Sequence, residues 1–328
     1  MKLWKPAVIA VAMAASMLLP SNASAAEWKA YTYGTTEQVA NVSGLKAIFD
    51  EIKTKTGGEI DIKLSLGGQL PIKVNTITQA VGDNVVTFGD DLFFHGSVPI
   101  GGLLRLPMLI QDPAEFTKAY EIVKPHLVAG FDKQGAVLLG YYTYPMQVLF
   151  SNKKLTSLDD IKGKKIRVTS PEQAEFVKSF GGTGLTMGPP EVAPALQQGA
   201  IDGVITASAG GGKVWGDLLT HRYALPVSYV DAALIVNKDA FMALTPEAQA
   251  AIRAAVANQS PTIIKTLLAD EDTVNASLGS KGMVLTDSAK EVQAAATATM
   301  KPYWDTWAKA KGKDAEAALA QVRAALGR

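Results

Sequence analysis

Hydrophobic residues with strand spacing and with helix spacing alternate along this chain, and this alternation constrains its fold more than any other feature. Apolar residues recur at helical spacing over residues 45–52, and Gly57-Gly58 ends that segment. Apolar and polar residues then alternate over 60–66, the pattern of a strand with one buried face. Because another strand is expected over 27–33, this order predicts a parallel pair joined by a crossover helix.

The same order recurs further along the chain and indicates an α/β protein with two domains. Short apolar runs predict strands over 85–88, 136–142, 165–168, 204–206 and 232–236. Helices are expected over 113–128, 158–162 and 190–198. A further helix is expected to begin at 171, and most of the chain after 245 is expected to be helical. Four residues are expected as N-caps at the starts of helices: Asp112, Ser157, Ser170 and Thr245.

The first 26 residues have the layout of a secretory signal peptide. Lys2 and Lys5 precede a 13-residue apolar run over 7–19, and Ala23-Ser24-Ala25 offers a cleavage site, so we expect cleavage after Ala25 or Ala26. A membrane anchor is the alternative, but a membrane span needs about 20 apolar residues.

Length and composition narrow the classes of protein that remain. Without residues 1–26 the chain of 328 keeps 302 residues, enough for two α/β domains. It has no cysteine, so disulfides and thiolate chemistry are excluded. Of its 32 basic residues 30 lie beyond the signal peptide, against 31 acidic ones, which gives no sign of nucleic-acid binding.

No constellation typical of an enzyme is found. His95, His126 and His221 are far apart in sequence and lack metal-ligand spacing. Ser208 lies in a motif that resembles a nucleophile elbow without its first glycine, and Gly210-Gly211-Gly212-Lys213 lacks the spacing of a P-loop. We therefore expect no catalytic residue, no metal and no cofactor.

Arg167 is the strongest candidate for a binding residue. It lies near the end of the strand expected over 165–168, just before the helix that Ser170 begins. Ligands of open α/β sheets bind at this edge, and a guanidinium grips a carboxylate with two parallel hydrogen bonds. A solvated surface arginine is the alternative.

The sequence around Arg167 resembles that of the solute-binding proteins of TRAP (tripartite ATP-independent periplasmic) transporters. Residues 157–168 read Ser-Leu-Asp-Asp-Ile-Lys-Gly-Lys-Lys-Ile-Arg-Val. Residues 191–203 read Glu-Val-Ala-Pro-Ala-Leu-Gln-Gln-Gly-Ala-Ile-Asp-Gly. A looser likeness extends over nearly the whole chain after the signal peptide.

The resemblance implies a two-lobed clamshell with crossover strands and a long C-terminal helix that spans both lobes. We expect lobe I over 27–147 and 235–272, and lobe II over 148–234 and 273–328. Arg167 would form the salt bridge to the ligand carboxylate, with Thr206 and Ser170 as polar contacts. Glu191 and Asp202 of the motif are expected to be structural.

The chain departs from many dicarboxylate binders of this family. Gln147 stands where they carry a second arginine, and Asp90, Phe93 and Tyr33 lie in loops where other members often have different contacts. With Trp215 as a further aromatic contact, we predict a monocarboxylate with an apolar or aromatic body, such as a 2-oxo or 2-hydroxy acid.

These observations predict a monomeric periplasmic receptor that passes a small organic acid to TRAP membrane subunits and is not an enzyme. Two alternatives remain at this point: the binding protein of an ATP-driven importer and an exported α/β hydrolase.

Overall fold

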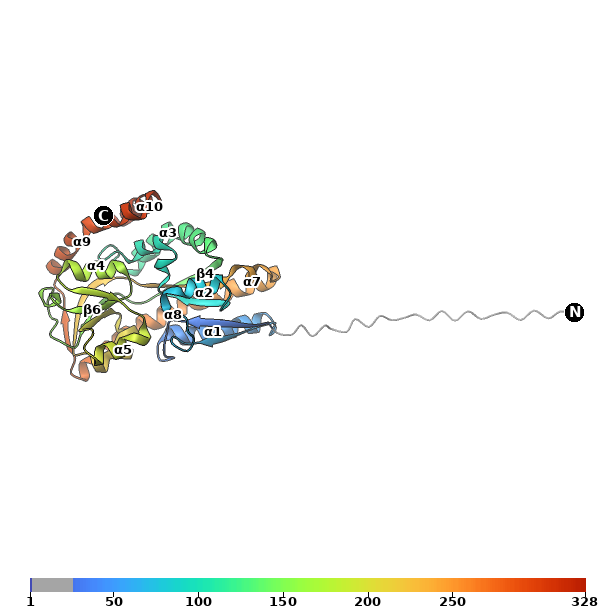
Figure 1. Cartoon of the computed structure of the whole chain (residues 1–328), viewed down its shortest axis with the longest axis horizontal. Coiled ribbons are helices and arrows are strands. Elements are labelled where there is room, and N and C mark those ends of the chain that lie inside the picture. Colours follow the sequence, from blue (N-terminus) through green and yellow to red (C-terminus); the bar gives the residue numbers. More distant parts are fainter. Residues whose placement is uncertain (2–25) are drawn as a thin grey trace.

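The computed structural model describes residue 1 and residues 26–328, and within these residues the strands form two sheets (Figure 1). The first sheet consists, in spatial order, of β2 (Ile60–Ser65), β1 (Ala26–Thr32), β3 (Phe88–Asp91), β10 (Asp231–Asn237) and β4 (Ala136–Thr143). The second sheet consists of β11 (Val284–Asp287), β9 (His221–Ser228), β5 (Gln147–Ser151), β8 (Gly203–Thr206), β6 (Lys165–Val168) and β7 (Thr183–Thr186).

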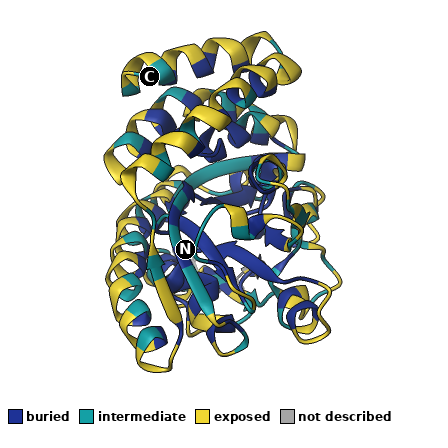
Figure 2. Cartoon of the chain, turned by 90° about the vertical axis from the view of Figure 1, so that its left-hand side faces the viewer, coloured by how far each residue is buried: buried dark blue, intermediate teal, exposed yellow. Residues whose placement is uncertain are grey.

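Helices cover both sheets. The α-helices are α1 (Ala40–Lys55), α2 (Ile77–Gly82), α3 (Pro113–Lys133), α4 (Pro171–Ser179), α5 (Pro189–Gln197), α6 (Lys213–Trp215), α7 (Lys238–Met242), α8 (Pro246–Ser280), α9 (Lys290–Lys311) and α10 (Lys313–Leu326). Shorter helical turns are η1 (Val74–Thr76), η2 (Phe94–Gly96), η3 (Pro99–Arg105), η4 (Asp159–Ile161), η5 (Ser208–Gly212) and η6 (Gly216–Leu218). Figure 2 shows that buried residues follow the strands, whereas the outer faces of the helices are exposed.

The chain passes between the sheets twice. Residues 144–146 lead from β4 to β5, and residues 229–230 lead back from β9 to β10. The Tyr144 amide donates to the Val230 carbonyl at 3.0 Å, so the two crossings lie side by side. The long helix α8 packs on α1 and β4 of the first half and on η5 of the second. The expected clamshell with a spanning helix is thereby present.

Local sequence signals explain where several helices begin. The side chain of Asp112 accepts from the Glu115 amide at the start of α3, and that of Thr245 accepts from the Ala248 amide at the start of α8. Each cap is followed by proline, whose missing N–H costs nothing at the first helical position. β1 runs parallel to β2 with α1 as the crossover, as the alternating pattern predicted.

The two acidic residues of the family-like motif have structural roles. Glu191 accepts from the Gly188 amide at 3.0 Å and caps α5. Asp202 accepts from the Lys165 amide at 2.9 Å and ties β6 to the turn before β8.

Some expected boundaries were wrong. β3 covers Phe88–Asp91 and not 85–88, because Val85 and Val86 close a turn after α2 through hydrogen bonds to the Ala80 carbonyl. The helix expected over 158–162 is the short turn η4, which has no side-chain cap. The expected cap Ser157 instead donates its amide, like Thr156, to the carboxylate of Asp160.

The sheet pairing also moves the expected lobe boundaries. β10 begins at Asp231 and pairs within the first sheet, so 231–234 leave the segment assigned to lobe II. Gln147 pairs with Ser228 in the second sheet. At the C-terminus, α9 packs on α4 whereas α10 packs on α3, so these helices bridge both halves rather than belonging to lobe II.

The signal peptide expected over 1–26 lies, apart from its first and last residues, outside the described part of the chain. Among the helices that the structure describes, none combines the length and apolar character that a bilayer crossing requires.

Candidate functional site

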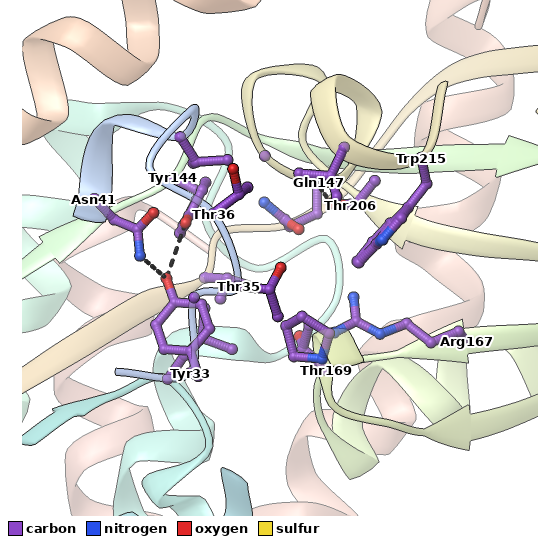
Figure 3. A pocket seen from close by; sticks show the side chains of 18 of the residues that line it. Tyr33, Thr35, Thr36, Asn41, Tyr144, Gln147, Arg167, Thr169, Thr206 and Trp215 are labelled. Carbon is purple, nitrogen blue, oxygen red and sulfur yellow. Dashed lines mark hydrogen bonds between the residues drawn. The ribbon is translucent and has the colours of Figure 1, made fainter. Parts of the chain in front are cut away.

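A pocket lies between the two sheets, beside the crossings (Figure 3). Its cavity volume is about 60 Å³. This suits a small ligand, since one water molecule needs roughly 10–15 Å³. The lining residues are Tyr33, Gly34, Thr35, Thr36, Val39, Asn41, Leu92, Phe93, Tyr144, Gln147, Arg167, Thr169, Pro189, Thr206, Gly210, Gly211, Val214, Trp215 and Val230.

Arg167 is the one charged side chain among these lining residues. β6 places it, with 3% of its surface exposed, and its Nε donates to the Met187 carbonyl at 2.9 Å. Within the described part of the chain, neither Nη group has a protein acceptor and no carboxylate lies within salt-bridge distance. Burial lowers the pKa of Arg167 to about 10, which leaves it charged at neutral pH. The pocket therefore holds one positive charge whose natural partner is an anion.

Trp215 lies beside the guanidinium. The Cζ atom of Arg167 is 5.3 Å from the centroid of the Trp215 ring, a cation–π distance. Gly211 makes this placement possible, because a Cβ there would lie 2.3 Å from Cζ3 of Trp215. The glycine run that sequence analysis rejected as a P-loop is thus needed for close packing.

Helix α8 anchors this glycine-rich loop. The carboxylate of Glu271 accepts from the amides of Ser208 and Ala209 at 3.1 and 2.8 Å, and Ser208 donates to Asn275 at 2.7 Å. These bonds tie the loop that carries Trp215 to the helix that spans both sheets.

The opposite wall is uncharged and rich in tyrosine. The hydroxyl of Tyr33 lies 2.8 Å from that of Tyr142 and 2.9 Å from that of Tyr144, and Asn41 donates to it at 3.4 Å. Figure 3 shows Tyr33 between Asn41 and Tyr144. Behind this wall, Tyr142 lies 2.8 Å from Oδ1 of Asp90.

Six of the eight predicted contact residues line the pocket: Arg167, Gln147, Thr206, Phe93, Tyr33 and Trp215. Asp90 and Ser170 do not line it. Asp90 is 1% exposed behind Tyr142, and its carboxylate faces the protein interior. The hydroxyl of Ser170 accepts from the Gln173 amide as the N-cap of α4 and is 1% exposed.

Several lining residues were absent from the predicted site, as was Tyr142 behind the pocket wall. Asn41 reaches the pocket from the start of α1, and Thr169 lies two residues beyond Arg167. Tyr142 and Tyr144 follow strand spacing, so their common face was readable from the sequence, but their contact with Tyr33 was not.

Comparison with known proteins assigns the family. Residues 33–310 match the profile described as bacterial extracellular solute-binding protein, family 7. This chain belongs to that family. A family 7 protein is an extracytoplasmic receptor and not an enzyme, so the alternatives of an exported hydrolase and an ATP-driven importer fall away. The expected membership of the TRAP receptors is confirmed.

Relatives of this chain match it over different lengths. A solute-binding protein of Verminephrobacter eiseniae is 25% identical over 287 residues, which cover 84% of this chain and 82% of that protein. Proteins of Salmonella typhimurium and Haemophilus influenzae are 28% and 32% identical over 160 residues. These residues cover 47% and 46% of this chain and 48% and 47% of those proteins, so the match spans about half the length of each relative.

Solved structures of receptors share the clamshell. Two extracytoplasmic solute receptors of Bordetella pertussis that bind pyroglutamic acid align with TM-scores of 0.85 and 0.84 at 24% and 27% identity. The alignments cover 91% and 90% of this chain and 100% and 99% of those chains. A TRAP periplasmic solute-binding protein of Shewanella oneidensis with bound succinate aligns with a TM-score of 0.83 at 20% identity, over 91% of this chain and 100% of that one. The expected fold class is confirmed.

Proposed function

We propose that this receptor, after cleavage of residues 1–26, captures a small organic acid with a single carboxylate in the periplasm. It would deliver the acid as a monomer to the membrane subunits of a TRAP transporter. The observation that supports this most is the solitary charge of Arg167. Both of its Nη groups lack protein acceptors within the described residues and are available to a carboxylate.

The rest of the pocket favours a ligand without a second charge. Nε2 of Gln147 donates one of its two protons to the Pro145 carbonyl at 3.0 Å, so this side chain offers the ligand hydrogen bonds and no charge. A second carboxylate would be desolvated without a counter-charge, at a cost of several kcal/mol.

An apolar body suits the remaining surface. Leu92, Phe93, Val214, Trp215 and Val230 contribute apolar or aromatic surface to the lining. A body of this kind is stabilised by burial of its apolar area, about 25 cal/mol per Å². Thr206 and Gln147 leave room for one or two polar atoms, as in a 2-oxo or 2-hydroxy acid.

A relative of known ligand supports the same class. The Bordetella receptor that is 27% identical binds pyroglutamic acid, which has one carboxylate on a compact neutral ring. Pyroglutamate therefore joins the 2-oxo and 2-hydroxy acids as a candidate ligand.

A thermal-shift screen tests the proposal. Purified protein lacking residues 1–26 is heated with L-pyroglutamate, pyruvate, lactate, phenyllactate, acetate or succinate, and hits are titrated by calorimetry. A monocarboxylate is expected to give the largest rise in Tm, because a ligand that binds only the folded state stabilises it. Tighter binding of succinate than of every monocarboxylate would contradict the proposed class.

Binding should also close the clamshell about the crossings at 144–146 and 229–230. Small-angle scattering is expected to show a smaller radius of gyration with the bound acid. An unchanged curve at saturation would argue against closure.

A further inference from the structure

A continuous chain of hydrogen bonds leads from the pocket wall to a buried carboxyl group. Tyr144 lines the pocket, and its hydroxyl lies 2.9 Å from that of Tyr33. Tyr33 continues to Tyr142 at 2.8 Å, and Tyr142 to Asp90 at 2.8 Å. Asp90 is 1% exposed, and this chain connects its buried carboxyl group to the pocket wall.

The number of protons fixes the direction of this chain. Three tyrosine hydroxyls supply three protons for three contacts. When Asp90 is ionised, the count requires every proton to point towards it: Tyr142 donates to Asp90 and Tyr33 to Tyr142. Tyr144 must then donate to Tyr33, the reverse of the direction that this contact has in the structure. Tyr144 then offers only lone pairs to the pocket.

Protonated Asp90 reverses every bond. Oδ1 of Asp90 donates to Tyr142, Tyr142 donates to Tyr33, and Tyr33 donates to Tyr144 in the direction that its geometry supports. The proton of Tyr144 is then free to donate into the pocket. Thr32 donates to Oδ2 of Asp90 at 2.6 Å and Asn41 donates to Tyr33 in both states, so neither alters the count.

We propose that Asp90 is a proton-binding site linked through Tyr142, Tyr33 and Tyr144 to the anion pocket, so that the receptor takes up a proton when it binds a carboxylate. This inference rests on the proposed function. A ligand oxygen that accepts a hydrogen bond from Tyr144 stabilises the protonated form of Asp90.

The charges around Asp90 are consistent with titration near neutral pH. Burial raises the pKa of Asp90 to about 7, against the lowering effect of hydrogen bonds from Thr32, Tyr142 and Asn41, and neighbouring Asp91 raises it further. From the other packed elements, β4 presents Tyr142 and β10 presents uncharged Leu234, while Arg167 of β6 acts on Tyr144.

Asp91 is a separate titrating group. Burial raises its pKa to about 6, but its carboxylate accepts from Thr78 and from the Phe93 amide and has no bond to the tyrosine chain. Its contribution can therefore be removed independently.

The linkage makes the affinity for the anion depend on pH. An anion that favours protonated Asp90 raises the pKa of that group, so affinity for the anion increases as pH falls through the titration range. Each pH unit by which the midpoint rises corresponds to about tenfold tighter binding at the low-pH limit.

The test follows the Asp90 carboxyl directly by ¹³C NMR of aspartate-labelled protein between about pH 5 and pH 9, with Asp90→Asn used to assign the signal. L-pyroglutamate and acetate are the probes. The free protein should show a midpoint near neutral pH, and each bound probe should raise it by about 0.5–1 unit. Asp91→Asn should keep this rise.

Tyr33→Phe is the decisive variant, because it removes the link between Tyr142 and Tyr144 and leaves the charges of Asp90 and Arg167 in place. Its probe-induced rise should fall below about half of the wild-type value. An undiminished rise in Tyr33→Phe would mean direct electrostatic action and would overturn the relay. The proton site would be overturned if Asp90 stays ionised throughout the titration of the free protein. It would also be overturned if neither probe shifts the midpoint.

The two proposals fail differently. If no acid of the screen binds, the proposed function fails. If acids bind and the Asp90 midpoint does not move, only the proton linkage fails.

Discussion

Arg105 and Arg167 are both buried, with 0% and 3% of their surface exposed, and they differ in what surrounds them. Nε of Arg105 lies 3.2 Å from Oδ1 of Asp231, and its Nη2 donates to the carbonyls of Leu92 and Asp231. Nη1 of Arg105 has no partner in the described residues but is closed off from solvent. Arg167 has one backbone acceptor and an open space in front of its other nitrogens.

A structural arginine and a binding arginine are distinguished here by the carboxylates in contact with them. Burial lowers the pKa of each guanidinium, and at Arg105 the charge of Asp231 acts against that effect. At Arg167 the charge of Glu191 also acts against burial, but no carboxylate of the described residues lies within salt-bridge distance, which leaves that position to a ligand.

The largest effect is expected on stability at Arg105. Arg105→Met leaves Asp231, which is 1% exposed, as a buried charge without its cation, and should lower the free energy of unfolding by about 3–5 kcal/mol. Urea unfolding measures this. The double variant Arg105→Met/Asp231→Asn should recover part of the loss. If Arg105→Met is as stable as wild type, Arg105 is not the structural arginine that we infer.

A methyl group in the loop behind Trp215 should have the next largest effect. In Gly211→Ala the new Cβ meets Trp215 at 2.3 Å and Oγ1 of Thr206 at 2.6 Å, so the loop must shift at a cost of about 1–3 kcal/mol. Urea unfolding and calorimetry with the bound acid should both report it. Gly96→Ala is the matched control, since its Cβ meets nothing within 4 Å.

Removing the ring beside Arg167 should weaken binding more modestly. Trp215→Leu loses the cation–π contact that orients the guanidinium, worth about 0.5–2 kcal/mol. Titration calorimetry is the measurement. Trp215→Phe keeps a ring and should lose less, and equal losses in the two variants would remove this role of the ring.

The smallest effect is expected on the stability of the unliganded protein when Arg167 is replaced. Arg167→Met removes a buried charge that has no counter-charge, so the unliganded protein should change its free energy of unfolding by less than about 1 kcal/mol. A loss as large as that of Arg105→Met in the same urea experiment would show that Arg167 is structural as well.

Much of the frame around Arg167 was predictable from sequence. The strand of Arg167, the cap at Ser170 and the helix that follows were expected from local signals, and the structure has all three. Ser170 was also expected to touch the ligand, but a hydroxyl committed to an N-cap is not available for that. Local patterns suggested both roles for Ser170, and in the structure its hydroxyl caps α4.

The tyrosine wall was not predictable because its members meet across long stretches of sequence. Tyr33 lies 109 residues from Tyr142 and 111 from Tyr144. Their meeting depends on β1 and β4 joining the same sheet, with β3 and β10 between them. β3 covers Phe88–Asp91, and this places Asp90 beside Tyr142. The strand expected over 85–88 did not predict that contact.

Titration calorimetry of wild type and Arg167→Ala with the tightest-binding acid of the screen tests whether Arg167 binds the ligand carboxylate. Loss of the guanidinium should cost about 2–5 kcal/mol of binding, on the order of 30-fold to several thousandfold in Kd, because the ligand carboxylate would remain desolvated without its partner. Arg167→Ala that binds this acid as tightly as wild type would contradict the assignment of the pocket as an anion site.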